Sequence, residues 1–316
     1  AIVFGSGMAA VTTSLLSHLN SGDHVVFYND IYGGTRNLIK KEFKKYGISF
    51  SFTSGSDIKD FENCIKKNTK GIYIESPSNP LLKIVDMQLI SKMAKSKKLW
   101  TMIDNTFASP VNQNPIDFGI DLVIHSATKY LGGHSDISAG AVISSKDRIN
   151  RVYELAKSLG GTLSEFSAWL LERSIKTLPI RVWQQNENAM ELANFLNSHS
   201  LISKVYYPGL INHEGHEIAK RQMKGFGGML SIELHPSIKP ELFLKNLKII
   251  KPVMSLAGIE STANYPKLTS HYSLTDKERS LQAISDQLIR LSAGIESIID
   301  LKNDIDNSLK WSENEN

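Results

Sequence analysis

Short β-branched runs alternate with segments of helical periodicity over the first 150 residues, and this alternation constrains the fold more than any other feature. We predict strands at residues 2–4, 25–28, 48–53, 71–75, 99–104, 122–125 and 139–144. Between them, apolar residues such as Met8, Val11 and Leu15 recur at helical spacing. Strand–helix–strand alternation is typical of an α/β fold with a mostly parallel central sheet and helices on both of its faces.

The pattern changes near residue 150. A long helical stretch covers about residues 151–197, with interruptions at Gly160, Gly161 and Pro179. Strands are predicted at 204–207, 229–234 and 249–254, helices at 240–247 and 275–291, and a fraying polar tail at 307–316. We therefore predict a large domain over residues 1–180 and a smaller C-terminal α+β domain over 181–316. The apolar run after Ala1 is interpreted as the end of a strand whose preceding sequence is missing.

Composition narrows the function classes. The excess of Lys and Arg over Asp and Glu is only 36 − 32, a net charge of +4 spread along the chain, so no nucleic-acid partner is expected. No apolar stretch approaches the ~20 residues that span a bilayer, so no membrane partner is expected either. Cys64 is the one cysteine, which excludes an intrachain disulfide and a Cys-rich metal site and favours a reducing, cytoplasmic setting.

A glycine-rich turn follows the first predicted strand. Residues Gly5 to Ala10 match G-x-G-x-x-A, and Asp30 lies at the end of the next predicted strand, two residues after Tyr28. This pattern suits a dinucleotide, with Asp30 on the ribose, and so a nicotinamide-dependent (NAD) oxidoreductase. Any phosphate suits it as well, because glycines let the backbone approach an anion at a helix N-terminus. A tight turn without a ligand is the plain structural alternative.

Two further strand ends carry groups suited to carbonyl chemistry. Asp104 ends one predicted strand, and Lys129 follows the next one within S-A-T-K. A lysine amine forms a Schiff base with an aldehyde, and an aspartate pairs with a protonated pyridine nitrogen. The candidates for a phosphate cup are Gly7, Met8, Ser126 and Thr128. Pyridoxal 5'-phosphate (PLP) needs an amine, an acid for its ring nitrogen and a phosphate cup. Taken alone, each residue has a purely structural interpretation, Asp104 as a loop cap and Lys129 as a surface residue.

Six blocks in order resemble the PLP-dependent enzymes of Cys/Met metabolism, the family of cystathionine γ-synthase, the cystathionine lyases and methionine γ-lyase. The blocks are S-G-M-A-A at 6–10, Y-G-G-T at 32–35, E-S-P-S-N-P at 75–80, D-N-T-F at 104–107, S-A-T-K-Y-L-G-G-H at 126–134 and R-L-S-A-G-I-E at 290–296. The resemblance spans most of the chain and implies the aspartate-aminotransferase fold, fold-type I among PLP enzymes.

The resemblance also implies residue roles. Lys129 is expected to be the Schiff-base lysine and proton shuttle, Asp104 the partner of the pyridine nitrogen, and Tyr32 a ring-stacking proton donor. The expected phosphate ligands are Gly7, Met8, Ser126 and Thr128. The expected substrate-binding residues are Asn79, Ser255 and Arg290. Taken alone, Tyr32 reads as a half-buried aromatic residue, and Arg290 as a surface ion pair at the end of an amphipathic helix.

The implied function is PLP-dependent trans-sulfuration, a γ-elimination or γ-replacement at the carbon–sulfur bond of an amino acid. The same family offers β-elimination or O-acylhomoserine sulfhydrylation as alternatives, and an inactive scaffold is a third reading. Gly34 stands where methionine γ-lyases usually have Cys, Phe107 favours the γ-enzymes, and Met254 stands where cystathionine-handling γ-enzymes often have Glu. A homo-oligomer, a dimer of dimers, is implied. No metal is expected, because the histidines of residues 213–217 lack a third ligand nearby.

Overall fold

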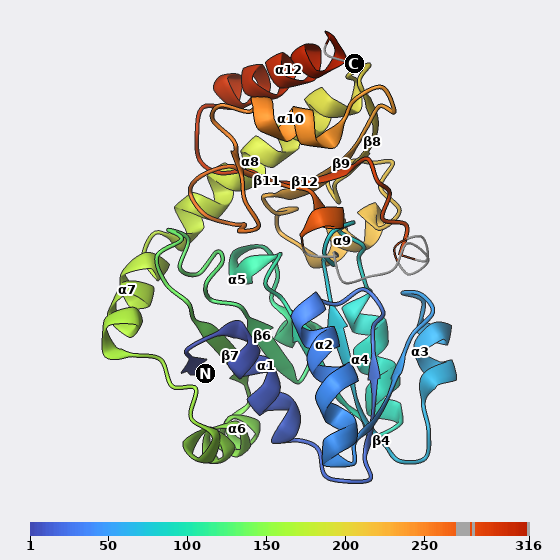
Figure 1. Cartoon of the computed structure of the whole chain (residues 1–316). Coiled ribbons are helices and arrows are strands. Elements are labelled where there is room, and N and C mark those ends of the chain that lie inside the picture. The colour runs from blue at the N-terminus through green and yellow to red at the C-terminus, as the bar shows by residue number, and fades with distance from the viewer. Residues whose placement is uncertain (270–278, 280–281, 315–316) are drawn as a thin grey trace.

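The computed structural model describes residues 1–269, 279 and 282–314, which form two β-sheets from successive parts of the chain (Figure 1). The first sheet has seven strands in the order β1-β7-β6-β5-β4-β2-β3. Its strands are β1 (Ile2–Phe4), β2 (His24–Phe27), β3 (Ser49–Phe52), β4 (Thr69–Glu75), β5 (Trp100–Asp104), β6 (Leu122–His125) and β7 (Gly140–Ser144). β7 runs antiparallel to both of its neighbours, β1 and β6, and all the other strand pairs are parallel, so the sheet is mostly parallel, as predicted.

Helices flank this sheet. They are α1 (Gly7–Leu16), α2 (Gly33–Glu42), α3 (Ile58–Cys64), α4 (Met87–Ser96), α5 (Ser109–Asn112), α6 (Lys146–Leu159) and α7 (Glu165–Ile175), with the 3₁₀ turns η1 (Phe43–Tyr46) and η2 (Pro115–Phe118). α1 packs against β6 and β7, and α4 packs against β5. Every residue of β2, β5 and β6 is buried, which is typical of parallel strands covered on both faces. The α/β fold class is therefore confirmed.

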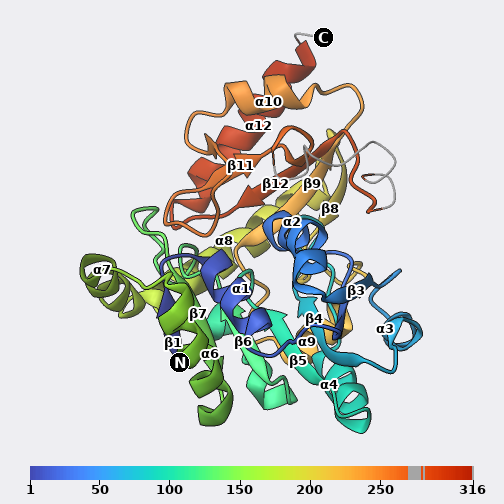
Figure 2. The same ribbon diagram turned by 60° about the horizontal axis from the view of Figure 1, so that its bottom comes forward.

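The second sheet has five strands in the order β10-β11-β12-β9-β8. They are β8 (Ile202–Tyr206), β9 (Met229–Leu234), β10 (Lys251–Pro252), β11 (Thr262–Asn264) and β12 (Leu288–Ser292). Its helices are α8 (Leu178–Asn197), α9 (His216–Gln222), α10 (Pro240–Asn246) and α12 (Ile298–Asn314), with the turn η3 (Pro266–Leu268). Figures 1 and 2 place α10 and α12 on the side of this sheet away from the first sheet. The boundary at residue 180 falls inside α8 and stays a prediction.

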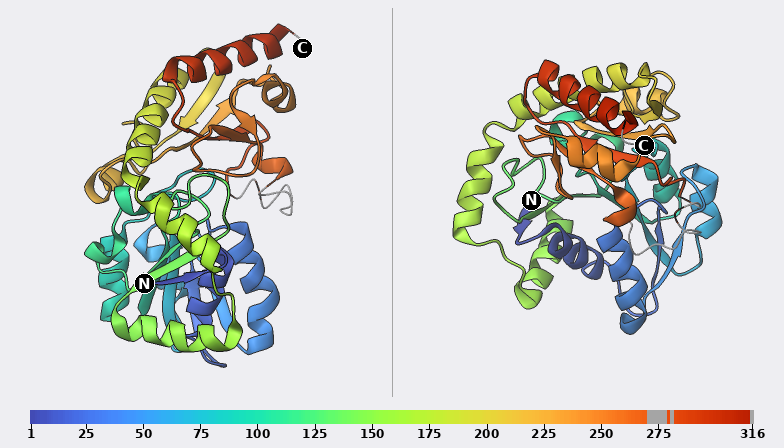
Figure 3. Two further views of the ribbon diagram at one scale, coloured as in Figure 1. Left: turned by 90° about the vertical axis from the view of Figure 1, so that its left-hand side faces the viewer. Right: turned by 45° about the horizontal axis from the view of Figure 1, so that its top comes forward.

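The two faces of the second sheet have different environments because side chains alternate along a strand. Ile289 and Leu291 of β12 belong to the core formed with α8, α10 and α12. Arg290 therefore lies on the opposite face, where its neighbour in register, Ser231, donates to the Pro80 carbonyl at 2.7 Å. The inner face of this sheet thus meets a loop of the first sheet, and Figure 3 shows the two sheets one above the other.

Several expectations for the C-terminal region are wrong. Residues 288–292 form strand β12 and not the end of a helix, and Arg290 is only 2% exposed, so it is no surface ion pair. Part of the predicted helix 275–291 lies outside the described residues. The polar tail is ordered to Asn314 in α12, because Leu309 on its inner side is buried in the core. The predicted strand at 249–254 shortens to Lys251–Pro252, and β11 was not predicted.

The sheet order also excludes the dinucleotide reading of the glycine turn. In a dinucleotide-binding fold the first two strands are neighbours, which brings the acid of the second strand to the ribose. Here β7, β6, β5 and β4 separate β1 from β2. Asp30 instead pairs with Lys83 at 2.8 Å. Among the described helices, none is long and apolar enough to cross a membrane.

Candidate active site

The carboxyl ends of three parallel strands meet at one edge of the first sheet. Glu75 ends β4 and Asp104 ends β5, and the two are partners in the β4–β5 register. The segment that carries Lys129 begins directly after β6, the next strand along. Ligands of open α/β sheets bind at this edge, because the connections there are free to carry varied side chains. The fold therefore brings the predicted Asp104 and Lys129 segments to adjacent strand ends.

Thr106 fixes the Asp104 carboxylate. Its hydroxyl and backbone N–H donate to Asp104 Oδ1 at 2.5 and 3.0 Å, and the Ser126 N–H donates to the same hydroxyl at 2.8 Å. Burial raises the pKa of Asp104, and the two bonds from Thr106 oppose that rise. A buried carboxylate without a cation costs free energy, so a protonated ring nitrogen is a fitting partner. Sequence reasoning assigned no role to Thr106, although it lies within the D-N-T-F block.

The N-terminus of α1 forms a cradle for an anion. The Ser6 hydroxyl caps the helix by accepting the Ala9 N–H at 3.0 Å. Within the described part of the chain, no acceptor bonds the N–H groups of Gly7 and Met8, and no partner bonds the Ser126 hydroxyl. A Cβ on Gly7 would lie 2.9 Å from Ser126 Cβ, so glycine lets the helix approach β6. Free N–H groups, a helix dipole and a hydroxyl suit a phosphate.

The Thr128 hydroxyl, an expected phosphate ligand, bonds to the protein backbone in this structure. Its hydroxyl donates to the Ala139 carbonyl at 3.2 Å and accepts the Ala139 N–H at 3.0 Å. These bonds tie the lysine segment to the chain that enters β7. A phosphate contact from Thr128 stays a prediction, and it would require the hydroxyl proton to leave Ala139.

Lys129 is half-buried in a tight turn, where its N–H donates to the Ser126 carbonyl at 3.0 Å and the Gly133 N–H donates to its carbonyl at 2.7 Å. Burial lowers the pKa of the Lys129 amine, and the positive charge of Arg290 lowers it further. The neutral amine is the nucleophile and the base, so this environment favours both roles.

Tyr32 precedes α2 and is 48% exposed. A Cβ on Gly34 would lie 2.5 Å from the Tyr32 ring and 3.2 Å from Met8 Sδ, so the ring and the start of α1 converge beside Gly34. The fold thus brings the predicted stacking residue next to the anion cradle. A cysteine at position 34 would displace the ring, which is a physical reason for glycine here.

Arg290 is held by groups from two connections. Its Nη1 donates to Asn79 Oδ1 at 3.2 Å, and its Nη2 donates to the carbonyls of Met254 and Ser255 at 3.0 and 3.4 Å. The Nε atom is buried without a partner among the described residues. Burial lowers the pKa of Arg290 to about 10. No acidic side chain pairs with it in the described chain, so it is suited to bind a carboxylate from a ligand.

Comparison with known proteins agrees with this geometry. The sequence model of the Cys/Met metabolism PLP-dependent enzyme family matches residues 1–310. This chain belongs to that family. It is 44% identical to a cystathionine β-lyase of Lactococcus lactis and to a cystathionine γ-lyase of Bacillus subtilis, each over 97% of this chain and 81% of the relative. A cystathionine γ-lyase structure from Lactobacillus plantarum, complexed with L-serine, superposes with a TM-score of 0.95 at 39% identity, covering 99% of this chain and 82% of that one.

Members of this family depend on PLP, and the residues present fit that cofactor. The anion cradle of α1 offers free N–H groups for the phosphate, Asp104 offers a buried acid for the ring nitrogen, and Lys129 offers a half-buried amine for the aldehyde. The individual assignments remain proposals. The histidines at 213 and 216 have other partners: a Gly215 N–H donates to His213 Nδ1, and His216 Nδ1 lies 2.8 Å from the Pro208 carbonyl.

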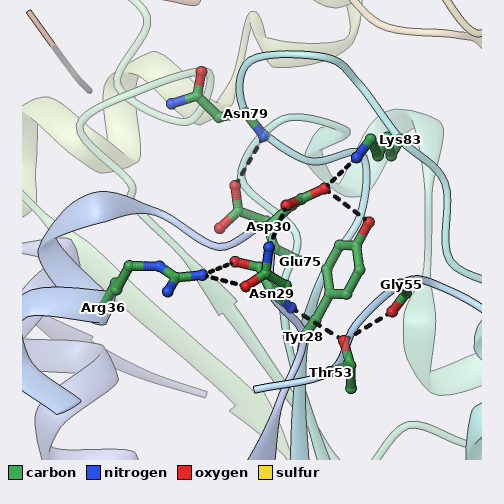
Figure 4. A network of polar contacts seen from close by, with 9 residues as sticks. All are labelled: Tyr28, Asn29, Asp30, Arg36, Thr53, Gly55, Glu75, Asn79 and Lys83. Atoms are coloured by element: carbon green, nitrogen blue, oxygen red, sulfur yellow. Dashed lines mark hydrogen bonds and ion pairs between the residues drawn. The ribbon is translucent and has the colours of Figure 1, made fainter. Parts of the chain in front are cut away.

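Glu75 also belongs to the site, although the sequence analysis assigns no role to it. It is the first residue of the E-S-P-S-N-P block. Its carboxylate is buried and accepts the backbone N–H of Tyr32 at 2.7 Å and of Asn79 at 3.3 Å. Figure 4 shows the bond to Asn79, with Asp30 and Lys83 paired nearby. Burial raises the pKa of Glu75 well above its usual range, and the neighbouring Asp104 adds to the rise. The sequence signal that could have identified Glu75 is an acid at the end of an apolar strand, next to the strand that ends in Asp104.

Proposed function

We propose that this chain cleaves or exchanges the carbon–sulfur bond of a sulfur-containing amino acid. The proposal is carried by Arg290, a buried cation without an acidic partner among the described residues, whose positive charge adds to burial in lowering the pKa of the Lys129 amine. An α-amino acid offers a carboxylate for Arg290 and a Cα proton within range of a base. Family membership supplies the cofactor and the reaction class.

When bound, PLP would supply the electron sink for the amino-acid substrate. The chain's own residues do the rest. In the proposal, Arg290, with Asn79 and the Ser255 carbonyl holding it in place, binds the substrate carboxylate through its planar fork. In its neutral form, which the lowered pKa favours, the Lys129 amine takes the Cα proton and returns it at a neighbouring carbon. The Tyr32 phenol donates a proton to the leaving sulfur.

The finer assignment is γ-elimination or γ-replacement on a sulfur-containing amino acid, as in cystathionine γ-lyases and γ-synthases. Relatives at equal identity include both a β-lyase and a γ-lyase, so β-elimination is the second candidate. O-acylhomoserine sulfhydrylation is another alternative. Met254 is 65% exposed beside the Arg290 contact, and an apolar side chain there gives a distal ammonium no partner. This favours substrates with a short or uncharged distal group within the same reaction class.

Product analysis tests the proposal. The purified chain is incubated with cystathionine, methionine, cysteine, or an O-acylated homoserine plus a thiol. γ-Elimination of cystathionine yields 2-oxobutanoate, ammonia and cysteine, whereas β-elimination yields pyruvate, ammonia and homocysteine. We expect Lys129→Ala to lose all keto-acid release, while the exposed Lys97→Ala retains it. Keto-acid release by Lys129→Ala at the native rate would contradict the assignment, and no product from any substrate would contradict the function.

We also propose that the chain assembles with copies of itself and works in the cytoplasm. An exposed apolar surface on α7 and α8, made by Phe166, Trp169, Ile180 and Trp183, supports assembly, since monomers rarely expose so many large apolar side chains together. The single cysteine, free at Cys64, supports a reducing compartment.

A further inference from the structure

Glu75 is a buried acid held without a cation. It is 5% exposed, and within the described chain no Lys, Arg or His forms an ion pair with it. Its two oxygens accept the N–H groups of Tyr32 and Asn79 instead. Its partner in the strand register, Asp104, is a second buried acid. Burying a carboxylate in such a place costs free energy that an apolar residue would avoid, so fold stability alone is a poor reason for it.

The two N–H donors belong to separate segments that each carry a side chain of the proposed site. Tyr32 lies at the N-terminus of α2, where no side-chain cap fixes the helix start. Asn79 lies in the connection after β4, and its side chain accepts from Arg290. One carboxylate therefore links the segment of the proposed stacking ring to the segment that orients the proposed carboxylate clamp.

We propose that Glu75 is a positioning residue that sets the relative position of Tyr32 and of the Asn79–Arg290 pair. The proposal rests on the roles given above to Tyr32 and Arg290. Glu75 does not touch the substrate; it acts through two backbone bonds. Two acceptor oxygens are needed, because both partners are donors. A glutamine in the same place keeps one acceptor, and its NH₂ group then faces the other N–H.

Asp304 offers a matched control. It is also a buried carboxylate, 6% exposed on α12, and it accepts the backbone N–H groups of Lys248, Ile249 and Ile250 at 2.7, 3.0 and 2.9 Å. It lies in the core side of the second sheet, away from the strand ends of the first. Asp304→Asn therefore disturbs the same kind of interaction without touching the proposed site.

The experiment compares Glu75→Gln with Asp304→Asn in the holoenzyme. Amide hydrogen exchange, which needs no turnover, is followed in peptides covering residues 32, 79 and 248–250, and KM and kcat are measured separately. For Glu75→Gln we expect faster exchange at residues 32 and 79 and a rise in KM of about tenfold, with a smaller fall in kcat. For Asp304→Asn we expect faster exchange at 248–250 only, and unchanged KM.

Unchanged exchange at both 32 and 79 in Glu75→Gln would overturn the positioning role, whatever the kinetics. Faster exchange with unchanged KM and kcat would overturn the proposal as well, because the two segments would then have loosened without any effect on substrate binding or turnover. In that case the roles proposed for Tyr32 and Arg290 would be wrong. If Glu75→Gln does not fold, Glu75→Asp replaces it: the charge stays, but a side chain one methylene shorter cannot reach both donors, so the same exchange and KM changes are expected.

Discussion

His125 ends β6 immediately before the lysine segment, and it is buried. Burial lowers its pKa to about 4, whereas in an unfolded chain a histidine titrates near its ordinary value of about 6.5. Between these values the unfolded state binds the proton and the folded state does not. The contribution of His125 to stability is therefore complete above pH 6.5 and is lost as the pH falls toward 4.

We expect this residue alone to remove about 2 kcal/mol of unfolding free energy between pH 7 and pH 5. Urea unfolding of the apoprotein at both pH values measures it, and the pH-dependent loss is compared between the native chain and His125→Gln. The variant should lose less on acidification, whatever its stability at pH 7. The exposed His235→Gln should match the native chain. Equal losses of unfolding free energy in the native chain and in His125→Gln would contradict the predicted contribution of His125 to the pH dependence.

Residue types were predictable from the sequence, but their surroundings were not. Lys129, Asp104 and the glycine turn were found because amine, acid and anion-binding chemistry follow from residue type and strand position. The contact between Arg290 and Asn79 joins residues far apart in the chain, and no local pattern encodes it. The bonds from the Thr128 hydroxyl to Ala139 are equally invisible, because a Thr in a phosphate motif and a Thr that ties a turn look the same in one sequence.

At the scale of elements, the first residue of α1, Gly7, lets the helix start lie close to the end of β6. Gly7 begins a helix of ten residues, and a Cβ there would meet Ser126 Cβ at 2.9 Å and Cα at 3.1 Å. Gly7→Ala should push the helix N-terminus from the β6 end and weaken PLP binding by about tenfold, because a charge-assisted hydrogen bond contributes roughly 1.5–3 kcal/mol. Titration of the apoprotein with PLP, followed by absorbance, gives the Kd.

Alanine favours a helix over glycine by about 1 kcal/mol, so weaker binding cannot come from loss of α1 itself. Circular dichroism should show the helix content unchanged. An unaltered Kd for Gly7→Ala would mean that the start of α1 does not hold the phosphate.

Strand prediction succeeded in the first sheet and for β9, which has its predicted bounds of 229–234, but it missed β11 and β12 in the second sheet. The strand at residues 122–125 was predicted with its observed bounds, since a short apolar run between turns has few other readings. In β12, Arg290 and Ser292 alternate with Ile289 and Leu291, and a five-residue strand beside further apolar residues was read as part of a helix. The short β10 and β11 carry too few residues for a period to show.

At the scale of the whole molecule, the proposed site lies between the two sheets. The strand ends of the first sheet supply Asp104, Lys129 and Glu75, and the inner face of the second supplies Arg290. A sequence gives the order of the elements, but not how one sheet is placed over the other. The link from Ser231 to Pro80 and the link from Arg290 to Asn79 fix that placement, and both are long-range contacts.

The apolar surface on α7 and α8 gives a prediction for the assembled molecule. Phe166 and Trp169 are 68% and 56% exposed on α7, and Ile180 and Trp183 are 68% and 60% exposed on α8, the helix that follows α7 in the chain (Figure 1). Aromatic residues of this kind contribute most of the binding free energy in protein interfaces. A second copy of the chain is the expected occupant, since closed symmetric homo-oligomers are the commonest assemblies.

Sedimentation velocity at micromolar concentration should show the native chain as an assembly larger than one chain, and Trp169→Glu with Trp183→Glu should shift it toward the single chain. A charge buried at the centre of such an interface costs several kcal/mol, which is enough to lower the affinity by more than a hundredfold. The matched control is Ile211→Glu, an apolar residue 89% exposed in a loop, which should leave the assembly intact. A native chain that sediments as a monomer, or tryptophan variants that assemble like the native chain, would show that this surface does not hold a second copy.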